Sequence, residues 1–302
     1  MVCHDGRPEL LMPINRKIMG VSRGSVSKKA IFGYGYSGGV LSMTNLVSNI
    51  GVVSGDVTGV GTGRYQLGAA SYGTGQAIFG YGEANGPKSS LTNKVSSIGV
   101  VATDTAGVGT ARGWIAAAGY GTDKAIFGYG KTNSKVSITN LISNAGVAAT
   151  DTTGVGTARS ELAAAGYGTD RAIFGYGQAN SSSSLTNLVT NTGVVATDTT
   201  GVGTARSQLA AAGYGTDKAI FGYGSSNFTN LVSNTGVVAS DVASVGTGRN
   251  SLAAAGYGTD KAIFGYGSSN FTNLVSNTGV VASDVASVGT GRPYLAASSY
   301  GT

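Results

Sequence analysis

The word Ala-Ile-Phe-Gly-Tyr-Gly at residues 30–35 decides the fold, because it returns five more times along the chain. The further copies begin at residues 77, 125, 172, 219 and 262, with spacings of 47, 48, 47, 47 and 43 residues. A second word, Leu-Ala-Ala-Ala-Gly-Tyr-Gly, stands before the last three copies, and looser versions occupy 67–73, 115–121 and 295–301. Self-similarity at a period of about 20 to 50 residues is typical of repeat architectures. The chain is therefore built from six copies of one unit.

Each unit contains several short segments that are typical of β-strands. Leu-Ala-Ala-Ala-Gly-Tyr and Lys-Ala-Ile-Phe-Gly-Tyr-Gly flank a Gly-Thr-Asp turn, which predicts an antiparallel hairpin with the aspartate as a turn residue. After a variable polar loop, Thr-Asn-Leu-Val-Ser-Asn leads into Gly-Val-Val-Ala-Thr-Asp, where we expect one long or bulged strand. The Gly-Val-Gly-Thr-Ala-Arg stretch that closes the unit is a candidate for a weak fourth strand. No segment has a sustained helical period.

Three or four short strands in about 45 residues predict an all-β fold, a six-bladed β-propeller over residues 28–302. Radial packing buries both faces of each blade and leaves only short edges. A β-helix is the alternative, but its coils are usually shorter and its strands pair in parallel. The last inner strand, at 295–302, lacks a following partner, and the first Ala-Ile-Phe lacks an inner strand before it. We expect these two ends to pair and close the ring, with residues 17–22 as an alternative inner strand.

The composition fits an ordered chain whose net charge is unevenly distributed. Of the 302 residues, 41% are hydrophobic and 11% are charged, which is the opposite of the balance in disordered chains. The net charge is +6, and residues 1–29 hold six basic residues against two acidic ones. We predict a basic N-terminal arm over 1–27, either a solvated terminus or a segment that docks to an acidic partner or a larger assembly. The remainder carries too little charge to predict nucleic-acid binding.

The sequence offers almost no residues for catalysis or metal binding. His4 is the only histidine and Cys3 the only cysteine. A catalytic zinc site needs three protein ligands, and a catalytic triad would have to recruit His4. We therefore predict no enzymatic activity, no catalytic residues, no metal and no cofactor.

The chain also lacks the apolar segments that membranes and export require. No window reaches the roughly 18 consecutive apolar residues of a membrane span. Residues 1–11 lack the basic region followed by an apolar run that marks a secretory signal. We expect a soluble protein, made in the cytoplasm, without membrane insertion.

Twelve charged residues occupy fixed places in the repeat, because an aspartate precedes an arginine by eight residues in all six units. The aspartates are Asp56, Asp104, Asp151, Asp198, Asp241 and Asp284. The arginines are Arg64, Arg112, Arg159, Arg206, Arg249 and Arg292. A ring of acid–base sites is one interpretation of this pattern. We favour a structural staple, an ion pair or hydrogen-bonded turn that pins each blade, because repeats require such a device.

The order of glycines, aspartate and arginine resembles the kelch-type blade over about residues 28–302. Gly-Tyr-Gly stands where that family has its double glycine, and Val or Gly stands where it has tryptophan. The resemblance implies a β-propeller. The amino-acid sequence of the repeat also resembles that of tandem Gly-Tyr-Gly-repeat proteins predicted from tailed bacteriophages of aquatic environments.

The phage resemblance implies a virion-associated structural protein, such as a tail, fibre or decoration protein, that mediates assembly or host attachment. Its partners would be other virion proteins or a glycan or protein on the host surface, and not nucleic acid. The basic arm would dock it to the particle. The alternative is a free carbohydrate-binding, lectin-like propeller.

The loop after Gly-Tyr-Gly varies most between units and is the candidate binding face. It spans 36–43, 83–91, 131–138, 178–185, 225–228 and 268–271. The candidate residues are Tyr36, Glu83, Lys88, Lys131, Lys135, Gln178, Asn180, Phe228 and Phe271. We expect these loops to share one face with the loops entering each inner strand, because function concentrates on loops held by a rigid scaffold. Drift in tolerant surface loops is the alternative. The repeated tyrosines, such as Tyr34 and Tyr81, either pack between blades or stack on sugars.

Overall fold

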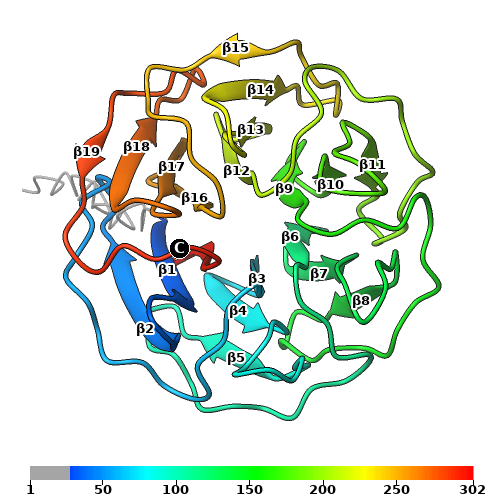
Figure 1. Ribbon diagram of the computed structural model, residues 1–302, viewed down its shortest axis with the longest axis vertical. Helices are drawn as coiled ribbons and strands as arrows, with labels where there is room; N and C mark the ends of the chain where they lie inside the picture. Colours follow the sequence, from blue (N-terminus) through cyan, green and yellow to red (C-terminus); the bar gives the residue numbers. More distant parts are fainter. Residues whose placement is uncertain (1–27, 302) are drawn as a thin grey trace, which may run out of the picture.

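Residues 28–301, which are the residues that the computed structural model describes, form an all-β structure without a helix. Their twenty strands make six small antiparallel sheets, four with three strands and two with four. Figure 1 shows the sheets arranged around a common centre, with one edge strand of each facing it. The architecture is propeller-like.

Each sheet runs outward from an inner strand through a second to a third. The inner strands are β3 (Gly68–Tyr72), β6 (Ala116–Tyr120), β9 (Ala163–Tyr167), β12 (Ala210–Tyr214), β16 (Ala253–Tyr257) and β20 (Ala296–Tyr300). The second strands are β1 (Lys29–Tyr36), β4 (Gln76–Gly80), β7 (Lys124–Gly128), β10 (Arg171–Gly175), β13 (Lys218–Gly222) and β17 (Lys261–Gly265). The third strands are β2 (Val40–Val47), β5 (Thr92–Val95), β8 (Thr139–Ile142), β11 (Thr186–Val189), β14 (Phe228–Val232) and β18 (Phe271–Val275).

The hairpin predicted from the two repeated words is present in every unit that contains both. In β9 and β10, for example, Ala163 lies opposite Gly175 and Tyr167 opposite Arg171. The second strand of the first sheet has its inner partner at the other end of the chain. There β1 pairs antiparallel with β20, from Lys29 opposite Tyr300 to Gly33 opposite Ala296. The alternative inner strand at 17–22, like the whole arm over 1–27, lies outside the described residues.

The second strands form the most buried layer, because neighbouring sheets cover both of their faces. Ala172, Ile173 and Phe174 of β10 are fully buried. The glycine that ends the second strand makes room for the phenylalanine of the next sheet: a Cβ on Gly128 would lie 2.6 Å from Phe174 Cζ. Tyr129 directly follows β7 and has a φ of 62°. Its ring packs on Phe174 with centroids 5.1 Å apart. Aromatic contacts of this kind link adjacent sheets.

The third strand is shorter than the sequence predicts. The expected single long strand is wrong, because the chain turns at the Ser-Asn pair that follows the strand. Directly after β8, Ser143 Oγ accepts hydrogen bonds from the backbone N–H groups of Ala145 and Val147, at 3.3 and 3.2 Å. Beyond this turn the pairing continues only as isolated bridges, Ile142 to Ala148 and Thr139 to Thr152.

The fourth strand lies elsewhere than expected. Where it occurs, as β15 (Val242–Ala243) and β19 (Val285–Ala286), it directly follows the aspartate and pairs with the start of β14 or β18. The first unit has Val57 at this place and the next three have threonine, and all four form single bridges, such as Thr139 to Thr152. The Gly-Val-Gly-Thr stretch is not a strand, because its threonine and arginine reach over to the next sheet.

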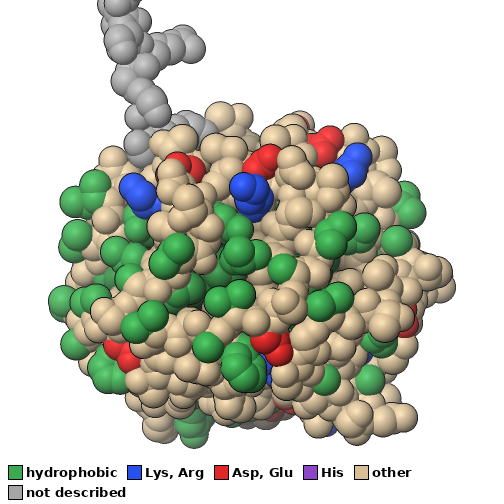
Figure 2. Space-filling view, turned by 90° about the horizontal axis from the view of Figure 1, so that it is seen from above, with side chains coloured by type: hydrophobic (Ala, Val, Ile, Leu, Met, Phe, Trp, Pro, Cys, Tyr) green, Lys and Arg blue, Asp and Glu red, His purple; other side chains and the backbone are tan. Residues whose placement is uncertain are grey.

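Hydrophobic side chains are scattered over the outer wall of the molecule, which Figure 2 shows at right angles to the first view. Ile50, Ile98, Val147 and Val245 are among the exposed ones. Charged side chains gather toward the upper edge in this view. Within residues 28–301 there is no helix of the length and apolarity that a membrane span needs.

Candidate binding site

Two cavities lie along the centre of the molecule and share a ring of six alanines. The shared alanines are Ala69, Ala117, Ala164, Ala211, Ala254 and Ala297. The central cavity is about 550 Å³ and is bounded by the hairpin turns between inner and second strands. A smaller cavity of about 120 Å³ lies at the opposite end, where the chain enters the inner strands. The small side chains of the repeated Leu-Ala-Ala-Ala word leave this space open.

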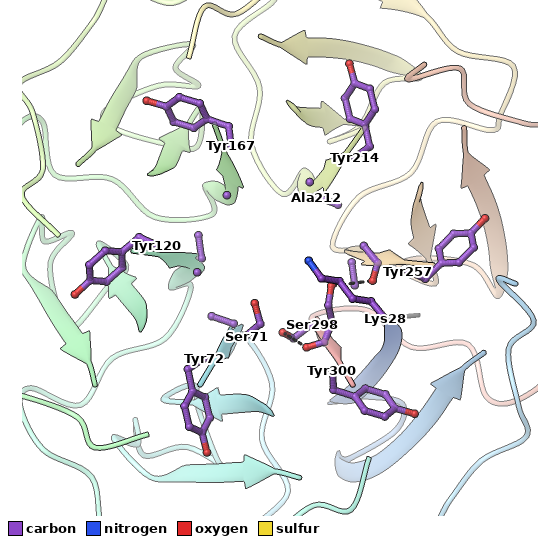
Figure 3. Close-up of a pocket in the computed structure, with 18 of the residues that line it drawn as sticks. Lys28, Ser71, Tyr72, Tyr120, Tyr167, Ala212, Tyr214, Tyr257, Ser298 and Tyr300 are labelled. Carbon is purple, nitrogen blue, oxygen red and sulfur yellow. Dashed lines mark hydrogen bonds between the residues drawn. The ribbon is translucent and has the colours of Figure 1, made fainter. Parts of the chain in front are cut away.

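The central cavity is lined by small side chains, alanines together with serines such as Ser71 and Ser298, and the charged residues at its turn end are of both signs. Figure 3 shows Tyr72, Tyr120 and Tyr167 pointing away from the centre, and the Nζ end of Lys28 pointing toward it. Lys124 Nζ lies 3.7 Å from Asp123 of the same turn. The turn aspartates also hold the turns together: the Gly121 N–H donates to the carbonyl of Asp170 at 2.7 Å, and this contact recurs from turn to turn.

The smaller cavity is lined by the residue that stands two places after each repeat arginine. We call these six residues the mouth ring: Gln66, Trp114, Glu161, Gln208, Ser251 and Tyr294. All six have φ between 56° and 61°, although none is glycine. Backbone hydrogen bonds link neighbours around the ring, for example from Gln208 N–H to Glu161 O at 2.9 Å and from Ser251 N–H to Gln208 O at 2.9 Å. One backbone conformation thus presents five kinds of side chain at six places.

Left-handed backbone at a non-glycine residue costs roughly 1–3 kcal/mol and persists where the surroundings enforce it. Here the hydrogen bonds of the mouth ring enforce it at six equivalent places. All six residues share this backbone strain, so the strain does not explain which residue type occupies each place. The side chains are therefore free to carry recognition.

Four aromatic rings form a row from the mouth ring outward. Trp114 and Tyr294 meet edge to face with centroids 5.0 Å apart, and Tyr65 lies 6.0 Å from Tyr294. Tyr36 lies 5.7 Å from Tyr65 and has 41% of its surface exposed. Tyr65 Oη donates to Glu83 Oε1 at 2.9 Å. Burial, together with this hydrogen bond to the carboxylate, raises the pKa of Tyr65 to about 12.

Several predicted loop residues lie beside the mouth ring. Glu83 bridges to Tyr65, Lys131 to Gly113 and Gln178 to Ser160, each pairing with the residue just before a member of the ring. The loops after Gly-Tyr-Gly and the loops entering the inner strands thus lie together. Lys88, 4.0 Å from Glu83, belongs to the same group.

The remaining loop candidates are less suited to a shared site. Lys135 Nζ donates to the carbonyl of Ala179 in the next loop, beside the exposed Asn180. Phe228 and Phe271 are not free loop residues. They are the half-buried first residues of β14 and β18, because they pair with the fourth strands.

The aspartates and arginines do not pair within a unit as the eight-residue spacing suggested. Every ion pair between a repeat arginine and a repeat aspartate of the described residues joins the arginine of one unit to the aspartate of the next, while Arg64 reaches Asp104 of the next unit through Asn93. The pairs are Arg112–Asp151 at 3.8 Å, Arg159–Asp198 at 3.2 Å, Arg206–Asp241 and Arg249–Asp284 at 3.6 Å, and Arg292–Asp56 at 3.9 Å. The physical reason is that the chain has crossed to the next sheet by the time it reaches the arginine. We call each such contact an intersheet joint.

The joint between the units of Arg112 and Asp151 shows how the fully buried guanidinium is satisfied. Arg112 Nη2 donates to Asn140 Oδ1 at 2.7 Å, and Nε donates to the carbonyl of Tyr129 at 2.8 Å. The guanidinium also lies 4.6 Å from the centroid of the Tyr81 ring. The arginine is therefore held between its own unit and the next.

The buried asparagine of each joint escaped the sequence-based assignment. Asn140 has no exposed surface, and its Nδ2 donates to Asp151 Oδ1 at 2.9 Å and to the carbonyl of Ala149 at 3.1 Å. The equivalent residues are Asn45, Asn93, Asn187, Asn230 and Asn273. A signal was present, because Thr-Asn opens the third-strand word in all six units. A polar residue that is constant within a strand indicates a buried hydrogen-bond network.

The joint aspartates are kept ionised. Partial burial alone would raise the pKa of Asp151, but hydrogen bonds from Thr110 and Asn140 and the charge of Arg112 outweigh it and lower the pKa below its ordinary value. Thr110 donates to Asp151 Oδ2 from both its hydroxyl, at 2.5 Å, and its backbone N–H, at 3.0 Å. With these donors in place the carboxylate has a structural role.

The repeated tyrosines are also structural. Tyr34 and Tyr81 have no exposed surface, so they cannot stack on a sugar in this conformation. No group of three or more His, Cys, Asp or Glu side chains in residues 28–301 is placed to hold a metal.

These features define a propeller-like repeat protein with structural intersheet joints and one asymmetric, partly aromatic mouth. A comparison with models of known protein families finds no match, and neither does a search of curated proteins.

Proposed function

We propose that the chain is a six-bladed β-propeller, closed by the C-terminal inner strand in the N-terminal blade. The pairing of β20 with β1 supports this proposal. So does the joint that Thr290 and Arg292 make with the first sheet: Thr290 Oγ1 donates to Asp56 Oδ2 at 2.8 Å, and Arg292 Nη2 to Asn45 Oδ1 at 2.8 Å. The inner strands contact one another in sequence, and β20 contacts β3 as well as β16.

We further propose that this propeller is a non-enzymatic binding scaffold, associated with a phage virion, that serves assembly or host attachment. The observation that carries the binding role is the contrast between constant joints and a divergent face. The joints repeat with the same residue types, whereas the mouth ring and the loops beside it differ from unit to unit. A rigid frame with variable side chains on one face is typical of recognition proteins. The virion association rests on the resemblance of the repeat's amino-acid sequence to that of phage proteins.

The virion association is tested by mass spectrometry of purified particles. The particles are purified on a density gradient and washed at high salt, which removes adsorbed protein. Peptides from this chain should remain in these particles. Their absence, with peptides of other structural proteins present, would end the proposal.

The binding face is tested by loop exchange. Residues 83–91, 131–138 and 178–185 are replaced by Ser-Ser-Asn-Phe, the loop that two other units carry. The fold should survive, because shortening a surface loop changes closure entropy little. Binding to blotted virion proteins or to a glycan array should be lost. A variant with only 83–91 replaced isolates the loop whose Glu83 accepts a hydrogen bond from Tyr65 of the aromatic row. Unchanged binding by the triple exchange would contradict the proposal.

A free carbohydrate-binding propeller is the second candidate function. The row of aromatic rings beside hydrogen-bonding side chains favours it. Virion proteomics and the glycan array separate the two, because a purely structural virion protein need bind no sugar.

A further inference from the structure

Aromatic residues at the divergent positions of the face gather in one sector. Three positions diverge: the first residue after Gly-Tyr-Gly, the first after the arginine, and the mouth-ring residue. Among eighteen such places, four are aromatic, and these are Tyr36, Tyr65, Trp114 and Tyr294. They come from three separate parts of the chain, yet each ring is within 6.0 Å of the next, centroid to centroid. We call this group the aromatic row.

The fold itself does not require these rings. At the mouth ring, Ser251 and Gln208 adopt the same left-handed backbone as Trp114 and make the same kind of backbone hydrogen bond. After the arginine, Ser160 and Ser207 stand where Tyr65 stands in its unit. Small polar residues therefore suffice for the architecture, and the aromatic row needs another explanation.

The polar groups around the aromatic row suit a ligand with many hydroxyl groups. Gln66 and Glu161, neighbours of Trp114 in the mouth ring, line the same cavity. Gln66 Oε1 is a buried acceptor without a hydrogen-bond partner among residues 28–301, so this amide gains hydrogen bonds if it turns toward a ligand. Glu83 accepts from Tyr65 and faces Lys88, which leaves this edge close to neutral.

The size of the site favours the end of an extended ligand. The cavity at the mouth ring holds about 120 Å³, well below the roughly 300–1,000 Å³ of enclosed small-molecule pockets. The aromatic row continues from it over the surface to Tyr36. A ligand would thus seat one unit beside Trp114 and lay further units along Tyr65 and Tyr36.

We propose that the aromatic row and the adjoining cavity bind an uncharged oligosaccharide, with its apolar ring faces stacked on the aromatic side chains and its hydroxyl groups bonded to Gln66 and Glu161. This inference rests on the proposed function as a binding scaffold and names its ligand class. Stacking buries apolar area of both partners, and planar amide and carboxylate groups hold the hydroxyl groups in one orientation.

Trp114 is the only tryptophan of the chain, so its fluorescence reports directly on the site. The purified full chain is screened on a glycan array and titrated with cellotriose, chitotriose and maltotriose. We expect a saturable change in tryptophan emission with at least one trisaccharide. Tyr65→Ser should weaken that binding by about tenfold or more, because one stacking surface is lost. Trp114→Gln, assayed on the array, should weaken it similarly.

The matched control is Asn250→Ser, which changes the position equivalent to Tyr65 in another sector to the residue found at Ser160 and Ser207. It should bind as the unmodified chain does. All variants should keep the same unfolding temperature, because each introduces a residue that other units already carry at that place.

Three outcomes decide the matter. Binding that Tyr65→Ser and Trp114→Gln weaken, and Asn250→Ser does not, supports the inference. Binding that both aromatic substitutions leave intact, but that loop exchange abolishes, overturns the inference and leaves the proposed scaffold function standing. No saturable signal with any trisaccharide and an empty array also overturn it, while the virion association is still judged by mass spectrometry.

Discussion

At the residue scale, Asn140 shows how much one buried amide does in an intersheet joint. It accepts from Arg112 and donates to Asp151 and to a backbone carbonyl. We predict that Asn140→Leu lowers the free energy of unfolding by about 2 to 3 kcal/mol, because a buried charged donor loses its acceptor. Urea denaturation measures this change.

The matched control is Asn144→Leu, an exposed asparagine four residues further along the same unit. Its effect should lie within about 0.5 kcal/mol. Equal effects of the two substitutions would show that the joint contributes nothing particular to stability.

The joint aspartates predict an acid-sensitive fold. In all six, partial burial opposes ionisation, but hydrogen bonds from asparagine and threonine outweigh it and lower the pKa. The folded state therefore binds fewer protons than the unfolded chain, whose aspartates titrate near about 3.9. This stabilisation is complete above that pH and is lost as the pH falls through the lowered folded values.

Thermal unfolding followed from neutral pH downward measures this dependence. We expect the midpoint to be steady down to about pH 5 and then to fall steeply. Asp151→Asn should lower the midpoint at neutral pH and make the acid slope shallower. A midpoint that does not change below pH 4, with about the same value in both chains, would contradict the role of these carboxylates.

The residue scale is also where sequence reasoning was least complete. Constancy in all six units identified Asp151 and Arg112 as structural, but spacing along the chain gave the wrong partner. The partner is set by how the chain crosses between sheets, and eight residues of sequence carry no information on that. Asn140 carries no charge, so the charge pattern that singles out the aspartates and arginines does not indicate it, although it is equally constant among the six units.

At the element scale, the turn after the third strand must be glycine for two separable reasons. Gly146 has a φ of 69°, and a Cβ there would lie 2.5 Å from Tyr72 Cζ. Gly38, in the turn between β1 and β2, has a φ of 67° but no atom within 4 Å of such a Cβ. Substitution of these two glycines therefore separates the cost of backbone strain from the cost of steric overlap.

We predict that Gly38→Ala costs about 1–2 kcal/mol, the strain of left-handed backbone alone. Gly146→Ala should cost a further 1–3 kcal/mol or so, because the buried Tyr72 ring has to move. Chemical denaturation of both variants measures the difference. Equal losses of stability in the two variants would mean that the turn shifts easily to make room for the added Cβ atom and that the Tyr72 ring does not hold the turn in place.

Strand pairing could be predicted from the sequence where both strands of a pair lie in one short stretch of chain. The hairpins followed from two apolar words around Gly-Thr-Asp, and the structure pairs them as expected. The third strand was overestimated, because the Ser143 hydroxyl captures backbone donors and turns the chain. The mouth ring had no strand or turn signature, since its left-handed backbone is imposed by hydrogen bonds from other units.

At the scale of the whole molecule, the contact between first and last units makes the proposed ring testable. Arg292 reaches the first sheet with bonds that closely match those of Arg112. Its Nε donates to Tyr34 O at 2.6 Å and its Nη2 to Asn45 at 2.8 Å, and its guanidinium lies 4.9 Å from the Tyr266 ring centroid. In a closed ring, this joint and an internal one should matter equally.

We predict that Arg292→Met and Arg112→Met each lower the free energy of unfolding by about 2 to 5 kcal/mol, because a buried backbone carbonyl and a buried asparagine oxygen each lose a charged donor. Both variants should still unfold in one transition, because in a closed ring every unit packs against two neighbours. Calorimetry and urea denaturation measure both properties. In an open arrangement, the last unit would fray without affecting the others, and Arg292→Met would cost far less than Arg112→Met or give a second, early transition. That asymmetry would overturn closure, while the joints between internal units would keep the role assigned to them here.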